Sequence, residues 1–301
     1  MINRIGPIWA AVLAVLAMPR AADGEGTKIP IDTPSAFRTD LLLGAHRGGG
    51  GLWPENTLLA FTRSAARWPG VLLEGDVRLS ADGQVVILHD KKVDRTTNGA
   101  GLVEQLTLAE LKALDAGYRF SADGGKTFPY RGKGITVPTL AEVLAALPKQ
   151  RFLFELKEGE ALPEATVAVV RAAQAEDRFM LASFKAALIE KAKELAPEIA
   201  TCYGFPGAIE MMRTLREGDW DAYVPTDCML SVATELAERF QLKPEEIQRV
   251  RAKGVLYQVH TLNDPAAIRS HIEMGVDSIL TDRPDLLAQA IAEMKRPRPT
   301  E

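Results

Sequence analysis

The chain has 301 residues, of which 47% are hydrophobic and 25% charged, and its formal net charge at pH 7 is −4. This composition is typical of a globular protein, and without an internal shift in composition it favours a single large α/β domain. A slightly acidic chain lacks the basic stripe that neutralises a nucleic-acid backbone, so we expect no nucleic-acid partner.

Residues 1–22 have the pattern of a signal peptide. Arg4 precedes an apolar stretch, Ile5–Met18, that is too short to span a bilayer comfortably. Small residues at Ala17 and at Ala21-Ala22 offer two cleavage sites. We therefore expect export, to the periplasm in a Gram-negative cell, and no stable membrane insertion once the signal is removed. An uncleaved N-terminal anchor is the alternative.

Cys202 and Cys228 are the two cysteines of the chain. In an oxidising compartment they can form a disulfide, and they can equally be two buried thiols. The sequence has no CxxC motif or Cys/His cluster, so we expect no structural zinc site.

After a polar lead-in over residues 23–40, short apolar runs alternate with segments of helical period. The apolar runs predict nine strands, at 41–45, 71–76, 85–88, 152–156, 179–183, 199–203, 221–224, 255–259 and 278–280. Helical patterns lie among them at 57–67, 108–114, 140–147, 163–175, 185–196, 245–253 and 265–274. This alternation indicates parallel strands with helices outside, as in a TIM (β/α)8 barrel.

The second and third predicted strands have no helix between them. Asp82-Gly83 separates them, and Asp-Gly is a strong signal for a two-residue hairpin turn. Such a turn places Leu79 opposite Val86 and Asp76 opposite His89. The third strand then becomes a hairpin arm, which leaves eight strands for a barrel and makes Asp76 and His89 neighbours.

The stretch 115–137 is rich in glycine and aromatic residues and predicts a loop or small subdomain inserted after the hairpin. Long loops in barrels often shape access to the site, although a plain surface excursion is the alternative. We therefore predict one barrel domain over residues 41–290, with this small insertion, followed by a tail over residues 291–301.

The reacting groups of such barrels project from the C-terminal ends of the strands. The first strand ends in His46-Arg47, and the backbone amides of the glycines at 48–51 can approach an anion. Strand alternation places Glu74 and Asp76 on one face, where two carboxylates repel each other unless a cation compensates them. Oxygen ligands suit Ca²⁺ or Mg²⁺, so this pair predicts a hard divalent cation; a surface carboxylate pair is the alternative.

Two other segments add to this set. Glu155 and Lys157 share one face of a strand end, so Glu155 can complete a three-carboxylate metal site while Lys157 holds a phosphoryl oxygen. Read alone, this pair is merely a salt bridge. His89-Asp90 follows the hairpin arm. With His46 it gives two histidines beside acidic strand ends, which suits general acid and general base catalysis near neutral pH.

The ordered motifs resemble the glycerophosphodiester phosphodiesterase family from about residue 41 to residue 288. The matching segments are His46-Arg47-Gly48, Pro54-Glu55-Asn56-Thr57, Glu74-x-Asp76-Val77, Asp82-Gly83, His89-Asp90, Asp94-Arg95-Thr96-Thr97-Asn98-Gly99, Glu155-x-Lys157, Ser183-Phe184 and Thr281-Asp282-x-Pro284-Asp285. Each segment alone is weakly specific, whereas their shared order and spacing are highly specific.

The resemblance implies a TIM-barrel enzyme that hydrolyses glycerophosphodiesters to sn-glycerol 3-phosphate and an alcohol, with a divalent cation as cofactor. The site residues that it implies are the metal ligands Glu74, Asp76 and Glu155, the acid/base pair His46 and His89, and the substrate-binding groups Arg47, Lys157, Glu55 and Asn56. Two questions stay open: which histidine is the acid, and whether water or the neighbouring glycerol hydroxyl attacks first.

The chain departs from the family at one position. His260 stands where the family usually has an aromatic residue, often tryptophan, so the glycerol side of the pocket is altered and substrate preference is open. A lysophospholipase D-like enzyme for lipidated diesters needs an apolar entrance, which the aromatic residues at 118–130 can supply. Outside the enzymes, the alternative is a noncatalytic barrel that binds phosphodiesters; the retained acid/base and metal groups argue against it.

Overall fold

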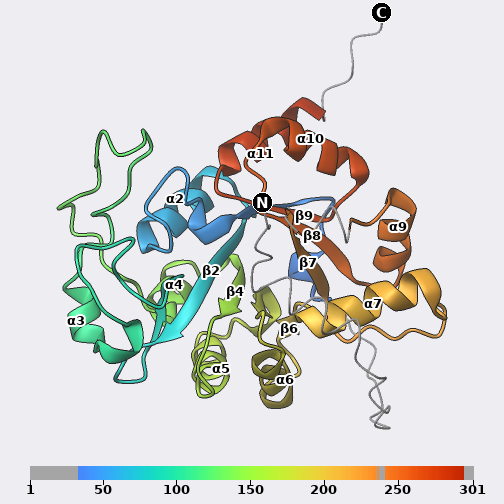
Figure 1. Cartoon of the computed structure of the whole chain (residues 1–301), viewed down its shortest axis with the longest axis horizontal. Helices are drawn as coiled ribbons and strands as arrows, with labels where there is room; N and C mark the ends of the chain where they lie inside the picture. The colour runs from blue at the N-terminus through green and yellow to red at the C-terminus, as the bar shows by residue number, and fades with distance from the viewer. Residues whose placement is uncertain (1–32, 235, 237–240, 295–301) are drawn as a thin grey trace, which may run out of the picture.

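The computed structural model describes residues 33–234, 236 and 241–294. These residues form a nearly closed barrel of parallel strands in the order β6-β5-β4-β2-β1-β9-β8-β7, which confirms the predicted TIM barrel (Figure 1). The strand bounds are β1 Leu42–Ala45, β2 Leu72–Leu79, β4 Arg151–Leu156, β5 Phe179–Ala182, β6 Ala200–Thr201, β7 Met229–Ala233, β8 Leu256–His260 and β9 Ser278–Thr281. The predicted signal peptide and most of the predicted lead-in lie outside the described residues.

Strands β6 and β7 meet where the barrel closes. The amide of Cys228 donates to the carbonyl of Thr201 (2.8 Å), and the amide of Tyr203 donates to the carbonyl of Met229 (2.9 Å). Cys202 and Met229 also form an isolated parallel bridge. Both cysteines are buried thiols, which corresponds to the second of the two predicted alternatives.

Helices cover the outside of the barrel (Figure 1). Their bounds are α2 Leu58–Arg67, α3 Leu108–Lys112, α4 Leu140–Ala146, α5 Leu162–Ala172, α6 Ala186–Leu195, α7 Phe205–Glu217, α9 Pro244–Ala252, α10 Pro265–Met274 and α11 Pro284–Met294. Helices α7 and α11 come in addition to the predicted ones. Some of the helices begin at a residue whose side chain caps the first turn. At the start of α2, the side chain of Thr57 accepts a hydrogen bond from the amide of Ala60. No helix in the described part of the chain is both long and apolar enough to cross a membrane.

The end of the lead-in closes the N-terminal side of the barrel. A short 3₁₀ helix, Ser35–Phe37, places the fully buried ring of Phe37 against interior side chains such as Leu42 and Leu72, which begin their strands. Arg151, the first residue of β4, donates to the carbonyl of Ala36 (2.6 Å). The opposite, C-terminal side of the barrel is left for the functional residues.

The β2–β3 hairpin forms as predicted, but its register was predicted wrongly by one residue. Strand β3, Val85–Ile87, pairs antiparallel with β2 so that Leu79 lies opposite Val85. The amide of Gly83 donates to the carbonyl of Ser80, and Gly83 has φ +75°. The loop therefore has three residues, 81–83. Its third residue, Gly83, has the left-handed backbone conformation that this position requires. Asp76 consequently pairs with Leu88, and the amide of Leu88 donates to the carbonyl of Asp76 (2.9 Å). His89 lies one residue further along the chain.

The predicted strand at 221–224 was also wrong, because the seventh barrel strand is β7 at Met229–Ala233. The earlier segment forms a turn in which the amide of Tyr223 donates to the carbonyl of Trp220. The two aromatic rings stack with their centroids 5.0 Å apart. The short apolar run at 221–224 thus reflects an aromatic packing contact of a loop rather than a strand.

The insertion at 115–137 folds without helix or strand and has a small core of its own. The amide of Ala116 donates to the carbonyl of Ile135 (2.8 Å). Both side chains belong to an apolar cluster that also contains Val86 of β3 and Leu111 of α3. The insertion is therefore packed on the outer side of the hairpin.

Candidate active site

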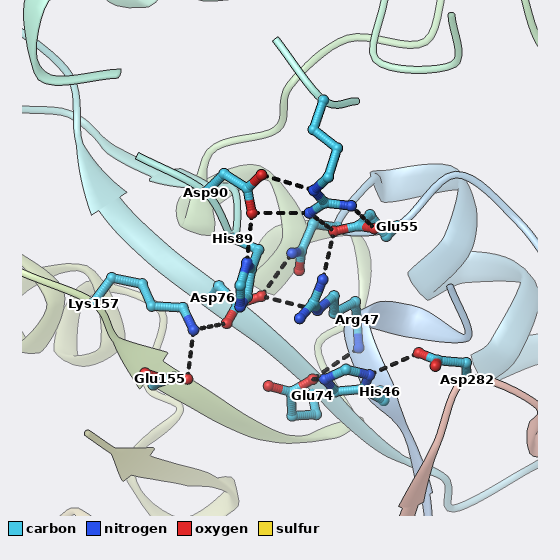
Figure 2. Close-up of polar contacts among 12 residues, drawn as sticks. His46, Arg47, Glu55, Glu74, Asp76, His89, Asp90, Glu155, Lys157 and Asp282 are labelled. Carbon is cyan, nitrogen blue, oxygen red and sulfur yellow. Dashed lines mark hydrogen bonds and ion pairs between the residues drawn. The ribbon is translucent and has the colours of Figure 1, made fainter. Parts of the chain in front are cut away.

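The acidic residues of the predicted site come from the neighbouring strands β2 and β4. Asp76 pairs in register with Glu155, and Glu74 precedes Asp76 by two residues on the same face of β2. Only 4% of Glu74 and 1% of Asp76 is exposed. Strand alternation thus brings the three carboxylates that were predicted as metal ligands to one place at the barrel mouth (Figure 2).

Two cations lie among these carboxylates. The ammonium of Lys157 is 2.8 Å from Asp76 Oδ1 and 2.6 Å from Glu155 Oε2. Arg47 Nε lies 3.7 Å from Asp76 Oδ2, and the amide group of Asn56 donates to the same oxygen (2.8 Å). Across the described ranges, no group of three or more potential ligands is already arranged around a common ion position. Lys157 instead bridges two of the predicted ligands.

The charges at this place are incompletely balanced. Burial raises the pKa of Glu74 to about 7, and repulsion by Asp76 adds to this. Burial also raises the pKa of Glu155, although Lys157 opposes the shift. For Asp76, burial favours a raised pKa, but Lys157, His89 and Arg47 together outweigh it and lower the pKa. Buried carboxylates with raised pKa values are stabilised by an added cation, and an all-oxygen donor set fits Ca²⁺ or Mg²⁺.

His46 follows β1 and is held by a carboxylate from the end of β9. Its Nδ1 lies 2.7 Å from Asp282 Oδ1, and Asp282 Oδ2 accepts a hydrogen bond from Asn263 (2.7 Å). Because the carboxylate is an acceptor, Nδ1 carries the proton and Nε2 is left facing Glu74, at 3.9 Å from its Oε2. This arrangement fixes both the tautomer and the orientation of the imidazole.

Three of the four glycine amides after His46, which were predicted to be able to approach an anion, instead bond to backbone carbonyls. The amides of Gly49 and Gly50 donate to the carbonyl of His46, and the amide of Gly51 donates to the carbonyl of Asp282. The amide of Arg47 donates to Glu74 Oε2 (2.8 Å). The glycines instead allow a tight turn, since Gly48 and Gly49 have φ +76° and φ +90°.

His89 belongs to a second His–carboxylate pair. Its Nδ1 lies 2.6 Å from Asp90 Oδ1. The guanidinium of Arg95 bridges Asp90 and Glu55, and Glu55 also accepts a hydrogen bond from Arg47. The backbone carbonyl of His89 accepts from Arg78 Nη2 (2.7 Å). The loop after β1, the loop after β3 and strand β2 are thereby connected by charged hydrogen bonds (Figure 2).

The two imidazoles are shifted in opposite directions. Burial disfavours the charged form of His46, but the carboxylates of Glu74 and Asp282 outweigh it and raise the pKa. Burial lowers the pKa of His89, and attraction by Asp76 offsets this only in part. One site thus contains an imidazole that favours the protonated form and another that favours the neutral form, which are the two states that acid/base catalysis needs.

A cavity of about 260 Å³ opens at the barrel mouth and includes these groups. The acidic, basic and imidazole side chains of its lining come from His46, Arg47, Glu74, Asp76, His89, Glu155, Lys157 and His260. His260, at the end of β8, bonds to Ser231 Oγ through Nδ1 (2.9 Å), and burial lowers its pKa to about 4. Glu55 and Asn56 do not line the cavity; they support residues that do. The insertion at 115–137 is also absent from the lining, so the apolar entrance predicted there is not found.

Sequence reasoning missed three supporting residues. Asp282 orients His46 from a position 236 residues away; it was noted within the motif at the end of the last barrel strand, but no role was given to it. Arg95 and Asp90 were noted within motifs but were given no role. Pairwise contacts between distant loops follow from barrel closure, which periodicity alone does not specify.

Comparison with known proteins agrees with this geometry. The model of the glycerophosphoryl diester phosphodiesterase family matches residues 46–286. The chain is 31% identical to a glycerophosphodiester phosphodiesterase of Caldanaerobacter subterraneus subsp. tengcongensis, over 82% of this chain and 96% of the relative. A relative from Bacillus subtilis with the same name is 27% identical over 94% of this chain and 96% of its own length.

Solved structures of phosphodiesterases are also similar to this chain. The crystal structure of a glycerophosphodiester phosphodiesterase from Agrobacterium tumefaciens is 28% identical, with a TM-score of 0.67 over 83% of this chain and 99% of that one. A phosphodiesterase from Oleispira antarctica, solved in complex with the product sn-glycerol-3-phosphate, is 31% identical, with a TM-score of 0.66 over 83% of this chain and 96% of that one.

Proposed function

The chain belongs to the glycerophosphoryl diester phosphodiesterase family, and from this premise we propose that it hydrolyses glycerophosphodiesters to sn-glycerol 3-phosphate and an alcohol by metal-dependent acid/base catalysis. The observation that carries the proposal is the convergence of two His–carboxylate pairs, three carboxylates and two side-chain cations on one cavity. The product bound to the Oleispira antarctica relative supports the same chemistry.

The metal proposal rests on the donor set. Glu74, Asp76 and Glu155 would hold the ion, since they are neighbouring oxygen donors of which Glu74 and Asp76 are buried, and since Glu74 and Glu155 have raised pKa values. When bound there, a divalent cation supplies positive charge to the nonbridging oxygens of the phosphodiester. Lys157 now neutralises two of these carboxylates, so its ammonium becomes available to a phosphoryl oxygen once the carboxylates have another cation.

Different side chains of the site transfer protons and stabilise the charge on the phosphoryl group. An oxygen nucleophile adds to phosphorus, and the bond from phosphorus to the alcohol oxygen breaks. One imidazole takes the proton of the nucleophile, and the other gives a proton to the leaving alkoxide, which departs poorly without it. Arg47 and Lys157 stabilise the charge that grows on the phosphoryl oxygens. The opposite pKa shifts support His46 as the acid and His89 as the base.

The test is a product assay with an acid/base variant. The wild-type protein with Mg²⁺, Ca²⁺ or Mn²⁺ should release glycerol 3-phosphate from glycerophosphocholine, and His46→Ala should lower kcat about a hundredfold or more. Retention of full diesterase activity by His46→Ala in the presence of metal would overturn its catalytic role. Arg213→Gln, on the exposed side of α7, serves as the control and should keep wild-type activity, because Arg213 forms an exposed ion pair with Glu210 outside the cavity.

A further inference from the structure

The active-site cavity continues beyond the charged residues toward α7. That side of its lining contains Phe184, Tyr203, Phe205, Ile209, Met212 and Val232, which we call the apolar arm. All the acidic and permanently cationic lining residues lie on the other side, on β2, on β4 and directly after it, and in the loop after β1. The cavity therefore has two chemically different ends that share one space.

Helix α7 supplies much of the apolar arm. Phe205, Ile209 and Met212 are separated by four and three residues, so they lie on one face of the helix. Arg213 and Glu210 lie on the exposed face, where they form an ion pair. Met212 of α7 belongs to the same apolar cluster as Tyr203, which follows β6, and Val232 of β7. The amphipathic helix thus turns side chains without charge toward the cavity.

Polar atoms next to the apolar arm are already engaged with the protein. The hydroxyl of Tyr203 accepts from the amide of Thr226 (3.2 Å) and bonds to the hydroxyl of Tyr223 (3.1 Å). Ser231 Oγ donates to Gln258 (2.7 Å). Ser183 Oγ donates to the carbonyl of Leu156 (2.7 Å). A polar ligand would find these groups occupied, whereas a hydrocarbon ligand would find carbon surface.

Phe184 lies where the arm reaches solvent. It lines the cavity although 64% of the residue is exposed, which is unusual for a large apolar side chain in the described part of this protein. An exposed phenyl group continuous with a buried apolar lining is typical of a surface that a hydrophobic ligand covers. The arm therefore extends from the cavity floor to the mouth.

We propose that the apolar arm binds a hydrocarbon chain carried by one of the two alcohols of the phosphodiester. This inference rests on the proposed function, because the diester must be held by the charged end of the same cavity. The chain comes either from an acyl group on the glycerol or from a long-chain alcohol on the other side of the phosphate.

Two substrate series test the proposal and separate the sources of the chain. The first is ethyl, butyl, hexyl and octyl esters of sn-glycerol 3-phosphate; the second is butanoyl, hexanoyl and octanoyl lysophosphatidylcholine, all below micellar concentration. In one series, kcat/KM should rise by about fourfold for each added methylene until the arm is filled. A flat dependence in both series, with hydrolysis intact, would overturn the inference and leave the proposed function standing. Glycerophosphocholine exceeding every chain-bearing diester would also overturn it.

Binding without turnover provides an independent readout. By calorimetry, octyl phosphate should bind wild-type protein at least tenfold more tightly than ethyl phosphate. Ile209→Asn and the exposed rim variant Phe184→Ser should reduce this ratio toward one, whereas Arg213→Gln should keep it. Equal affinity of the two phosphates for the wild type would refute the apolar arm. If calorimetry shows the preference but no diester is hydrolysed, the proposed function fails while the apolar binding site stands.

Discussion

At the scale of single residues, each imidazole of the site is oriented by a carboxylate, yet the sequence around the two pairs differs. Asp90 adjoins His89 in the chain, so this pair could be read directly from the dipeptide. Asp282 reaches His46 only because β1 and β9 are neighbours in the barrel. The side chains that carry chemistry were therefore predictable from local patterns, whereas one orienting partner depended on the closed topology.

Asp282→Asn should change the pH dependence of the reaction. Asp282 helps raise the pKa of His46, so its neutral analogue lowers that pKa. If His46 is the acid, activity is lost as the pH rises through its pKa, and the alkaline limb of the kcat/KM profile should move to lower pH. The acidic limb, set by the base, should stay in place. An alkaline limb at the wild-type position in Asp282→Asn would show that His46 is not the acid.

At the scale of elements, local signals identified most strands and helices but fixed their pairing less well. The dipeptide Asp82-Gly83 predicted the hairpin, while the choice between a two-residue and a three-residue loop shifted the register by one residue. The apolar run at 221–224 satisfied the pattern of a strand without being one. β7 at Met229–Ala233 is set by hydrogen bonds to its neighbours, which a single segment does not reveal.

Phe37 allows a test of how the lead-in contributes to the barrel. Phe37→Ala removes a fully buried ring at the N-terminal side of the strands, so the free energy of unfolding should fall by about 3–5 kcal/mol. Met294→Ala, at a residue that is 41% exposed, should change it by less than about 0.5 kcal/mol. Equilibrium denaturation in urea measures the free energy of unfolding of both variants. Equal stability of the two variants would show that Phe37 is not part of the barrel core.

At the scale of the whole molecule, the barrel places the carboxyl ends of its strands around one mouth, and the chemistry follows from that placement. Fold class and the charged residues of the site could be predicted because they recur at strand ends along the chain. The apolar arm could not, because it is formed by α7, which was not among the predicted helices, and by strand ends far apart in the sequence.

We also propose that the protein is exported, because Arg4 and the apolar stretch Ile5–Met18 have the pattern of a signal peptide. Expression of the full chain in a Gram-negative cell should give a periplasmic protein that begins after Ala17 or after Ala22. Mass spectrometry of the intact protein measures the N-terminus. Recovery of the complete chain in the membrane fraction would instead support an uncleaved anchor.

Hydrolysis should depend on a divalent metal ion that is held by the carboxylates at the barrel mouth. The most direct measurement is release of glycerol 3-phosphate from glycerophosphocholine by chelator-treated protein, before and after Ca²⁺, Mg²⁺ or Mn²⁺ is returned. We predict that activity is lost on metal removal and restored by at least one of these ions in the wild type, but not in Glu155→Gln. Undiminished activity after complete metal removal would contradict the claim.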